Sequence, residues 1–132
     1  MRNKEKVLIS MYKEYLKDDS NMQENINSEK LGIKQDEFFQ ALDKLQNEGL
    51  IDGIFITRGG INNSIIYAEA RNAIITSGGI DYIENKIGIE KTLDSKEKIK
   101  YLSKRVLSKT WDEVKDITTT TIAKTIAELK DK

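Results

Sequence analysis

The sequence predicts a mostly α-helical α+β fold: a winged helix-turn-helix domain over residues 1–90, followed by a basic helical extension over residues 91–132. Two observations support this prediction. Apolar residues recur at three- and four-residue spacing both before and after a central section, residues 50–70. Within that section, clusters of β-branched and aromatic residues flank a stretch rich in turn residues. The resulting order is helix, short helix, helix, hairpin, helix.

The first helix is expected over residues 4–17, where charged residues fill one side and the other carries apolar residues at helical spacing: Val7, Leu8, Met11, Tyr15 and Leu16. The string "DDSNMQEN" that follows is expected to be a polar loop. A short helix comes next, capped by Asn27 or Ser28. Leu31 is its one core residue. The helix is expected to end at Gly32, since glycine readily adopts the left-handed conformation that ends helices.

The third helix begins near residue 35 and ends before Gly49. Phe38, Leu42 and Leu45 recur at i, i+4 and i+7, and Ala41 beside them permits a close helix crossing. The remaining positions are predicted to face outward. These are Gln35, Asp36, Glu37, Phe39, Gln40, Asp43, Lys44, Gln46 and Asn47.

A hairpin follows, because residues 54–56 and 65–67 are strand-like and "TRGGINNS" between them consists mostly of turn residues. This places Arg58 at the hairpin tip. Another helix is expected after the hairpin, capped by Thr76 or Ser77, with Ile80, Ile83 and Ile87 forming its buried stripe.

The C-terminal segment, residues 95–131, also has helical spacing, and Ser95 is its expected cap. Four consecutive threonines at residues 118–121 weaken helix formation, so the segment is either one long helix or two that meet there. Its apolar stripe needs a partner: it either folds back on the first domain or pairs with its copy in a homodimer. Of the two, the dimer is slightly favoured.

Two strings in the sequence resemble the YjcQ family, small winged-helix proteins of Gram-positive bacteria and their phages, and more distantly the PadR and MarR regulators. The first string matches the family pattern at Gly32, Ile33, Asp36, Phe38, Leu45, Glu48, Gly49, Ile51 and Gly53. The second matches at Ile75, Thr76, Gly79, Tyr82 and Ile83. The resemblance covers about residues 4–87. It implies the winged-helix fold and supplies no catalytic or binding residues.

Composition excludes several classes of function. The 132 residues contain neither Cys nor His, which removes disulfides, thiolate metal sites and the commonest general base. There is no phosphate-binding loop or recognisable carboxylate pair, so we expect a protein that is not an enzyme and uses no cofactor or metal. The N-terminus lacks the apolar region of a signal peptide, and no apolar run approaches the roughly 20 residues of a membrane span. We therefore expect a cytoplasmic protein without a membrane partner.

Charge is distributed unevenly along a chain whose 22 basic and 22 acidic residues cancel. Residues 34–48 carry a net charge of −2, which DNA phosphates would repel. Residues 91–132 carry 11 basic against 7 acidic residues and supply the expected cationic face, which includes Lys96, Lys98 and Lys100. A DNA-binding protein of this sequence would have to hold the duplex mainly with cations beyond residue 95.

Two functions follow from these observations. The slightly favoured one is a DNA-binding transcription regulator of phage or mobile-element type that contacts double-stranded DNA. Its candidate residues are Gln35, Gln40, Lys44, Asn47, Arg58, Lys100, Lys104 and Arg105. The alternative is a protein-binding module with a basic partner, such as a host nucleic-acid machine. Its candidate residues are Phe39, Asp36, Glu37 and Asp43, although Phe39 is better interpreted as covering the edge of the core beneath the hairpin.

Overall fold

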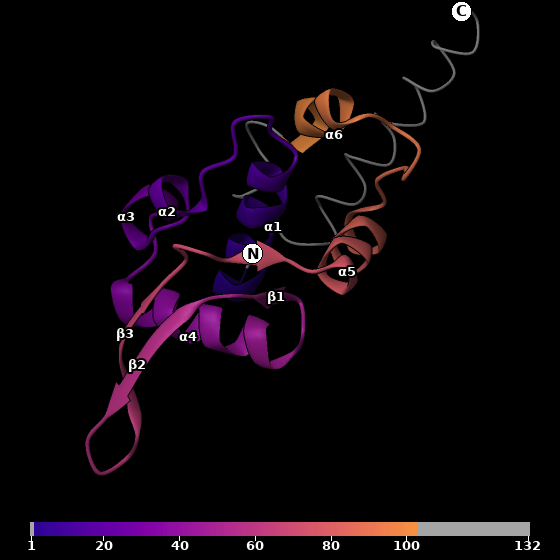
Figure 1. Cartoon of the computed structure of the whole chain (residues 1–132). Coiled ribbons are helices and arrows are strands. Elements are labelled where there is room, and N and C mark those ends of the chain that lie inside the picture. Colours follow the sequence, from indigo (N-terminus) through magenta and orange to yellow (C-terminus); the bar gives the residue numbers. More distant parts are fainter. Residues whose placement is uncertain (1, 103–132) are drawn as a thin grey trace, which may run out of the picture.

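Helices make up the chain before residue 50, and strands appear only after it. The computed structural model describes residues 2–102 and is a mixed α+β structure, about half helical (Figure 1). Its elements are α1 (Asn3–Tyr15), α2 (Met22–Asn25), α3 (Ser28–Leu31), α4 (Gln35–Asn47), β1 (Ile51–Asp52), β2 (Phe55–Gly59), β3 (Ser64–Glu69), β4 (Ile74–Ile75), α5 (Ser77–Ile87) and α6 (Ser95–Leu102).

Two of the predicted helices, α3 and α5, have a side-chain N-cap. The Asn27 side chain accepts a hydrogen bond from the backbone N–H of Lys30 at 2.9 Å, so Asn27 rather than Ser28 caps α3. Thr76 caps α5 in the same way, because its Oγ1 accepts from the N–H of Gly79 at 3.0 Å. Gly32 ends α3 in the left-handed region, at φ 65°. The predicted positions of these helices are confirmed.

The prediction of a plain loop at residues 18–25 was wrong, since α2 forms there. Asn21 caps α2, and the buried carboxylate of Glu14 accepts hydrogen bonds from the Asn21 N–H at 2.8 Å and the Asn25 side chain at 3.1 Å. Burial by itself would raise the pKa of Glu14, but these bonds and the Lys17 ammonium lower it overall. An anchor on α1, rather than local periodicity, therefore holds this short helix.

The strands form two separate antiparallel pairs. β2 and β3 make the predicted hairpin, with Phe55 opposite Glu69 and Gly59 opposite Ser64. The pair β1–β4 was not predicted and places Ile51 opposite Ile75. It closes the base of the hairpin and joins the end of α4 to the start of α5, because the Thr76 N–H donates to the Leu50 carbonyl at 3.1 Å.

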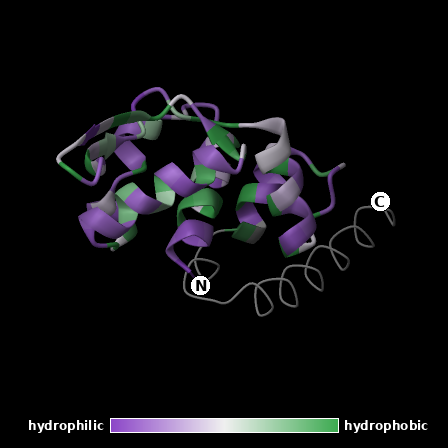
Figure 2. Ribbon diagram, turned by 90° about the horizontal axis from the view of Figure 1, so that it is seen from below, coloured by the Kyte–Doolittle hydropathy of each residue, from purple (hydrophilic) through white to green (hydrophobic). Residues whose placement is uncertain are grey.

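The core lies around α1, which packs against α4, β4 and α5. Hydrophilic and hydrophobic residues occupy different sides of these helices (Figure 2). The largest side chains that are almost fully buried are Tyr12, Leu8, Ile9, Met11, Leu42, Leu45, Ile51, Ile83, Ile87, Leu102 and Val7. Because Leu102 of α6 is among them, the core includes residues beyond the predicted domain boundary at residue 90. No helix among residues 2–102 is long and apolar enough to cross a membrane.

α6 begins as predicted at Ser95, but Ser95 does not cap it. The carboxylate of Asp94 accepts from the Glu97 N–H at 2.8 Å, and the Asp94 carbonyl accepts from the Lys98 N–H at 3.0 Å. An Asp side chain here satisfies an otherwise unpaired N–H and places a negative charge at the positive end of the helix. Residues 103–132 lie outside the described part, so the number of helices beyond α6 and the homodimer stay predictions.

Candidate nucleic-acid interface

The outward side of α4 is the surface on which the predicted site residues gather. Phe38, Ala41, Leu42 and Leu45 point into the core. Six of the predicted outward residues are exposed: Gln35, Asp36, Glu37, Gln40, Lys44 and Asn47. Helical periodicity therefore identified most of this face correctly.

Phe39 is the exception on this helix. Its side chain is only 8% exposed, and its ring makes an edge contact with the ring of Tyr67 on β3, with centroids 5.7 Å apart. The interpretation that Phe39 covers the edge of the core beneath the hairpin is confirmed. The alternative of an exposed anchor at Phe39 was wrong, because the hairpin covers the ring.

Two other outward residues attach the hairpin to α4. Asp43 forms an ion pair with Arg58 at 2.5 Å, and the Gln46 side-chain oxygen accepts from the Ile54 N–H at 3.1 Å. Arg58 therefore lies in strand β2 beside α4, and its predicted position at the hairpin tip was wrong. A register irregularity between Thr57 and Arg58 occurs at this point in the hairpin, and such bulges redirect side chains.

The start of α1 supplies partners for the carboxylates of α4. Lys4 Nζ lies 2.6 Å from the Glu48 carboxylate, and the Asn3 amide donates to Glu37 at 3.0 Å. With Asp43 bound to Arg58, three of the four carboxylates over residues 34–48 have a partner from another element. The folded helix is thus less repulsive to phosphate than its own sequence predicts.

A groove of about 230 Å³ runs between the start of α1 and α4. Its lining residues are Arg2, Asn3, Lys4, Glu37, Gln40, Ala41 and Lys44. Arg2 and Lys44 are exposed, and neither forms an ion pair with another residue in the described range. Lys4 is already paired with Glu48, so Arg2 and Lys44 are the cations that remain against Glu37, and they make the groove locally cationic. Gln40 adds an amide that both donates and accepts hydrogen bonds.

The predicted reading residues do not all share this groove. Gln40 and Lys44 line it, whereas Gln35 lines a second cavity of about 260 Å³ bounded by α3, α4 and β3. Asn47 is exposed in the last turn of α4. The structure therefore unites Gln40 and Lys44 with Arg2 and Lys4, two residues that the sequence did not single out. These four residues meet because α1 crosses α4, and a local sequence pattern does not predict how two helices cross.

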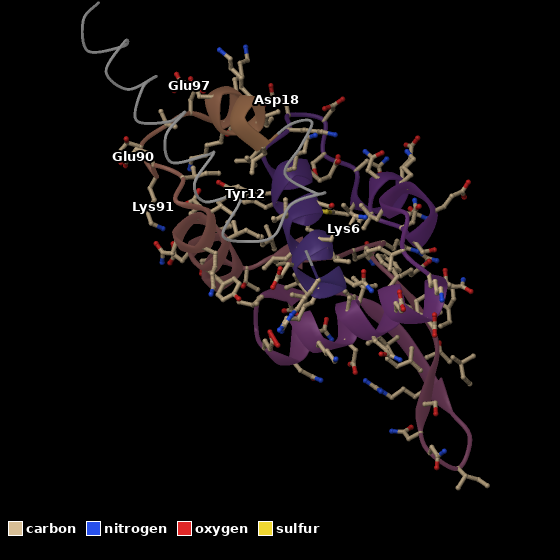
Figure 3. All side chains as sticks on the ribbon, turned by 180° about the vertical axis from the view of Figure 1, so that it is seen from behind. Lys6, Tyr12, Asp18, Glu90, Lys91 and Glu97 are labelled. Atoms are coloured by element: carbon tan, nitrogen blue, oxygen red, sulfur yellow. The ribbon has the colours of Figure 1, made fainter. Side chains whose placement is uncertain are left out.

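The described part of the basic extension does not join this surface. α6 and the hairpin tip lie at opposite ends of the molecule in both side views (Figures 1 and 3), so Lys100 on α6 is remote from the hairpin tip. Lys104 and Arg105 lie outside the described residues. The expectation that cations beyond residue 95 hold the duplex is thus not met by α6, and the nearby cations come from α1, α4 and β2.

Lys98 was predicted on the solvated cationic face, and this was wrong. It is buried and lies 2.7 Å from the Glu84 carboxylate on α5. Glu84 also accepts from the Tyr12 hydroxyl at 2.5 Å and lies 3.5 Å from Lys91 (Figure 3 labels Tyr12 and Lys91). Lys98 precedes Leu102 by one helical turn, so spacing alone places both on the buried side of α6.

The ionisation of this buried cluster follows from its contacts. Burial alone would raise the pKa of Glu84, but hydrogen bonds from Lys98 and Tyr12 and the charges of Lys98 and Lys91 lower it overall. Burial, together with the hydrogen bond to Glu84 and its negative charge, raises the pKa of the Tyr12 hydroxyl. The cluster is therefore an ionised structural contact that joins α1, α5 and α6.

The chain matches a known protein family over most of its length. The family model described as YjcQ protein matches residues 6–102, which ends at the last residue of α6. Searches of curated proteins and of solved structures found no match.

Proposed function

The chain belongs to the YjcQ family, and from that premise we propose that it is a non-enzymatic, cytoplasmic winged-helix protein that binds double-stranded DNA and regulates transcription. In this assignment α1, α3 and α4 are the three helices, and β2 and β3 are the wing. The order of elements and the hairpin attached to α4 support it. α4 is then the helix that enters the major groove, as the second helix of a helix-turn-helix does.

The observation that carries the proposal is the cationic groove beside α4. Arg2 and Lys44 line this groove beside Lys4, which is paired with Glu48, and we assign them to a DNA phosphate when the exposed side of α4 lies in the major groove. Gln40, between these cations, and Asn47 have amides that pair with the donor and acceptor edges of adenine. The groove supplies attraction on the same face that carries the reading side chains.

The proposal predicts opposite effects for two single charges on α4. We expect Lys44→Ala to weaken duplex binding about two- to fivefold at low salt, the effect of losing about 0.5–1 kcal/mol at an exposed charge contact. Asp36→Asn should strengthen binding by a similar factor, because it removes repulsion from phosphate. Fluorescence anisotropy with a labelled duplex measures the affinity of each variant. Lys96→Ala on α6 is the matched control and should leave the affinity for the duplex unchanged. If Asp36→Asn weakens binding, or Lys96→Ala acts like Lys44→Ala, α4 is not the contact face.

One observation favours the second candidate, a protein-binding module. Phe55 and Tyr67 are 53% and 41% exposed, and their rings are in contact on the hairpin with centroids 6.2 Å apart. Exposed aromatic pairs are typical of protein-binding surfaces, and the exposed carboxylates Asp36 and Glu37 on α4 would suit a basic partner. A module of this kind would not bind the labelled duplex even at low salt, so the experiment above separates the two functions.

A further inference from the structure

The tip of the hairpin is a tight turn at residues 60–63. The Asn63 N–H donates to the Gly60 carbonyl at 3.2 Å, and both residues have positive φ, 78° for Gly60 and 51° for Asn63. Glycine and asparagine adopt this conformation most readily, so the backbone accounts for their presence. It does not account for Ile61, the large β-branched residue between Gly60 and Asn62.

Ile61 is fully exposed, at 104% of its reference area. A fully exposed side chain contributes nothing to the core, and burying an isoleucine elsewhere would gain about 1.5–3 kcal/mol. Other exposed apolar residues of the hairpin have partial contacts: Ile66, 62% exposed, lies over Gly59, and Tyr67 contacts Phe39. Ile61 is thus available to a molecule outside the chain.

The position of Ile61 relative to α4 indicates which molecule Ile61 contacts. The contacts Asp43–Arg58 and Gln46–Ile54 fix the stem of the hairpin to α4. Ile61 follows Arg58 by three residues, of which the last two lie in the turn, so it lies at most about 10 Å beyond Arg58 along the hairpin. The tip projects away from the helices (Figure 1). With α4 in a major groove, the tip therefore reaches across the phosphate backbone toward the adjacent minor groove.

We propose that Ile61 is an apolar wedge that inserts into the minor groove and partly unstacks one base step, an inference that rests on the proposed DNA binding. Proteins that bend DNA from this groove commonly insert an isoleucine, leucine or phenylalanine between bases. The minor groove is about 6 Å across, so the side chain of Ile61 rather than the whole hairpin would enter it, and the amides of Asn62 and Asn63 can pair with acceptors at its edge. Pyrimidine–purine steps such as TpA unstack most easily, so they are the expected sites.

The test uses the full chain and a duplex of about 30 base pairs that contains TpA steps. Energy transfer between dyes at its two ends reports bending, 2-aminopurine in place of the adenine of a TpA step reports unstacking, and anisotropy reports binding. We expect the wild-type protein to bend the duplex by about 20° or more and to raise 2-aminopurine fluorescence. Ile61→Ala should abolish both signals while it weakens binding less than tenfold.

Ile66→Ala is the matched control, because it removes the same atoms from an exposed isoleucine on the stem of the same hairpin. It should leave bending and unstacking unchanged. If the wild-type protein binds the duplex without distorting it, or if Ile61→Ala and Ile66→Ala behave alike, the wedge is wrong and DNA binding stands. If the wild-type protein does not bind at low salt, both the wedge and the proposed function are wrong.

Discussion

Replacing Glu84 by alanine is expected to lower the free energy of unfolding by about 3–5 kcal/mol, the usual cost of removing one partner from a buried ion pair. Glu84 is 4% exposed, and its carboxylate contacts Lys98 at 2.7 Å and Tyr12 at 2.5 Å. Without it, the buried Lys98 ammonium and the Tyr12 hydroxyl lose their shared acceptor. Because the free energy of unfolding of native proteins is only about 5–15 kcal/mol, the folded state of the variant should be only marginally stable. Urea denaturation followed by circular dichroism measures the change.

Two variants make this expectation specific. Glu90→Ala removes the same side chain from an exposed position just beyond α5 and should change the stability by no more than about 0.5 kcal/mol. Replacing Glu84 and Lys98 together by methionine should cost much less than Glu84→Ala, since apolar pairs of similar size often substitute for buried ion pairs. Equal losses for Glu84→Ala and Glu90→Ala would show that the cluster does not stabilise the fold.

The same cluster predicts a dependence on pH. The pKa of Glu84 in the folded protein is lowered from its ordinary value of 4.5, so the folded state binds its proton less readily than the unfolded state does. Its contribution to stability is therefore complete above pH 4.5 and is lost as the pH falls through the lowered pKa. The stability difference between the wild-type protein and Glu84→Gln should shrink over that acidic range.

Gly79→Ala should have the second largest effect on stability. We expect it to lower the free energy of unfolding by about 3 kcal/mol, the upper end of the usual cost of overpacking. A Cβ at this position, in the first turn of α5, would lie 2.1 Å from the Leu50 carbonyl oxygen and 2.9 Å from Ile75 Cγ1. The first of these is backbone, so α5 would have to move away from the β1–β4 pair. Thermal unfolding of the variant measures the loss.

Gly78→Ala is the matched control for Gly79→Ala. The two glycines are neighbours in the first turn of α5, but a Cβ at Gly78 would meet no atom closer than 3.7 Å. Alanine is the better helix former by up to about 1 kcal/mol, so Gly78→Ala should leave stability unchanged or raise it. Similar losses for both variants would mean that helix propensity or main-chain freedom, rather than the close approach of α5 to Leu50, explains Gly79.

The sequence predicted those parts of the fold that depend on local chemistry. Helical spacing located α1, α4 and α5, and Asn27 and Thr76 marked the starts of α3 and α5. The elements it missed depend on distant partners: α2 is held by Glu14 of α1, and the β1–β4 pair joins segments more than twenty residues apart. Each of these strands has only two residues, too few for an alternating pattern.

The candidate site divides in the same way. Periodicity assigned Gln40, Lys44 and Asn47 to the exposed side of α4, because the buried side was evident from its apolar residues. The same reasoning overestimated the repulsion of DNA by α4, since it could not show that Lys4 and Arg58 pair with α4 carboxylates. Charge counted along a sequence window differs from charge on a surface whenever helices cross.

The most direct test of the cationic groove is the salt dependence of duplex binding by the full chain. Each phosphate contact adds about 0.9 to the slope of log affinity against log salt concentration, so the wild-type protein should bind steeply more weakly as salt rises. Arg2→Ala combined with Lys44→Ala should reduce the magnitude of that slope by about 1–2, one contact for each cation removed. An unchanged slope in the double variant, or no binding by the wild-type protein even at low salt, would contradict the assignment of this groove to DNA.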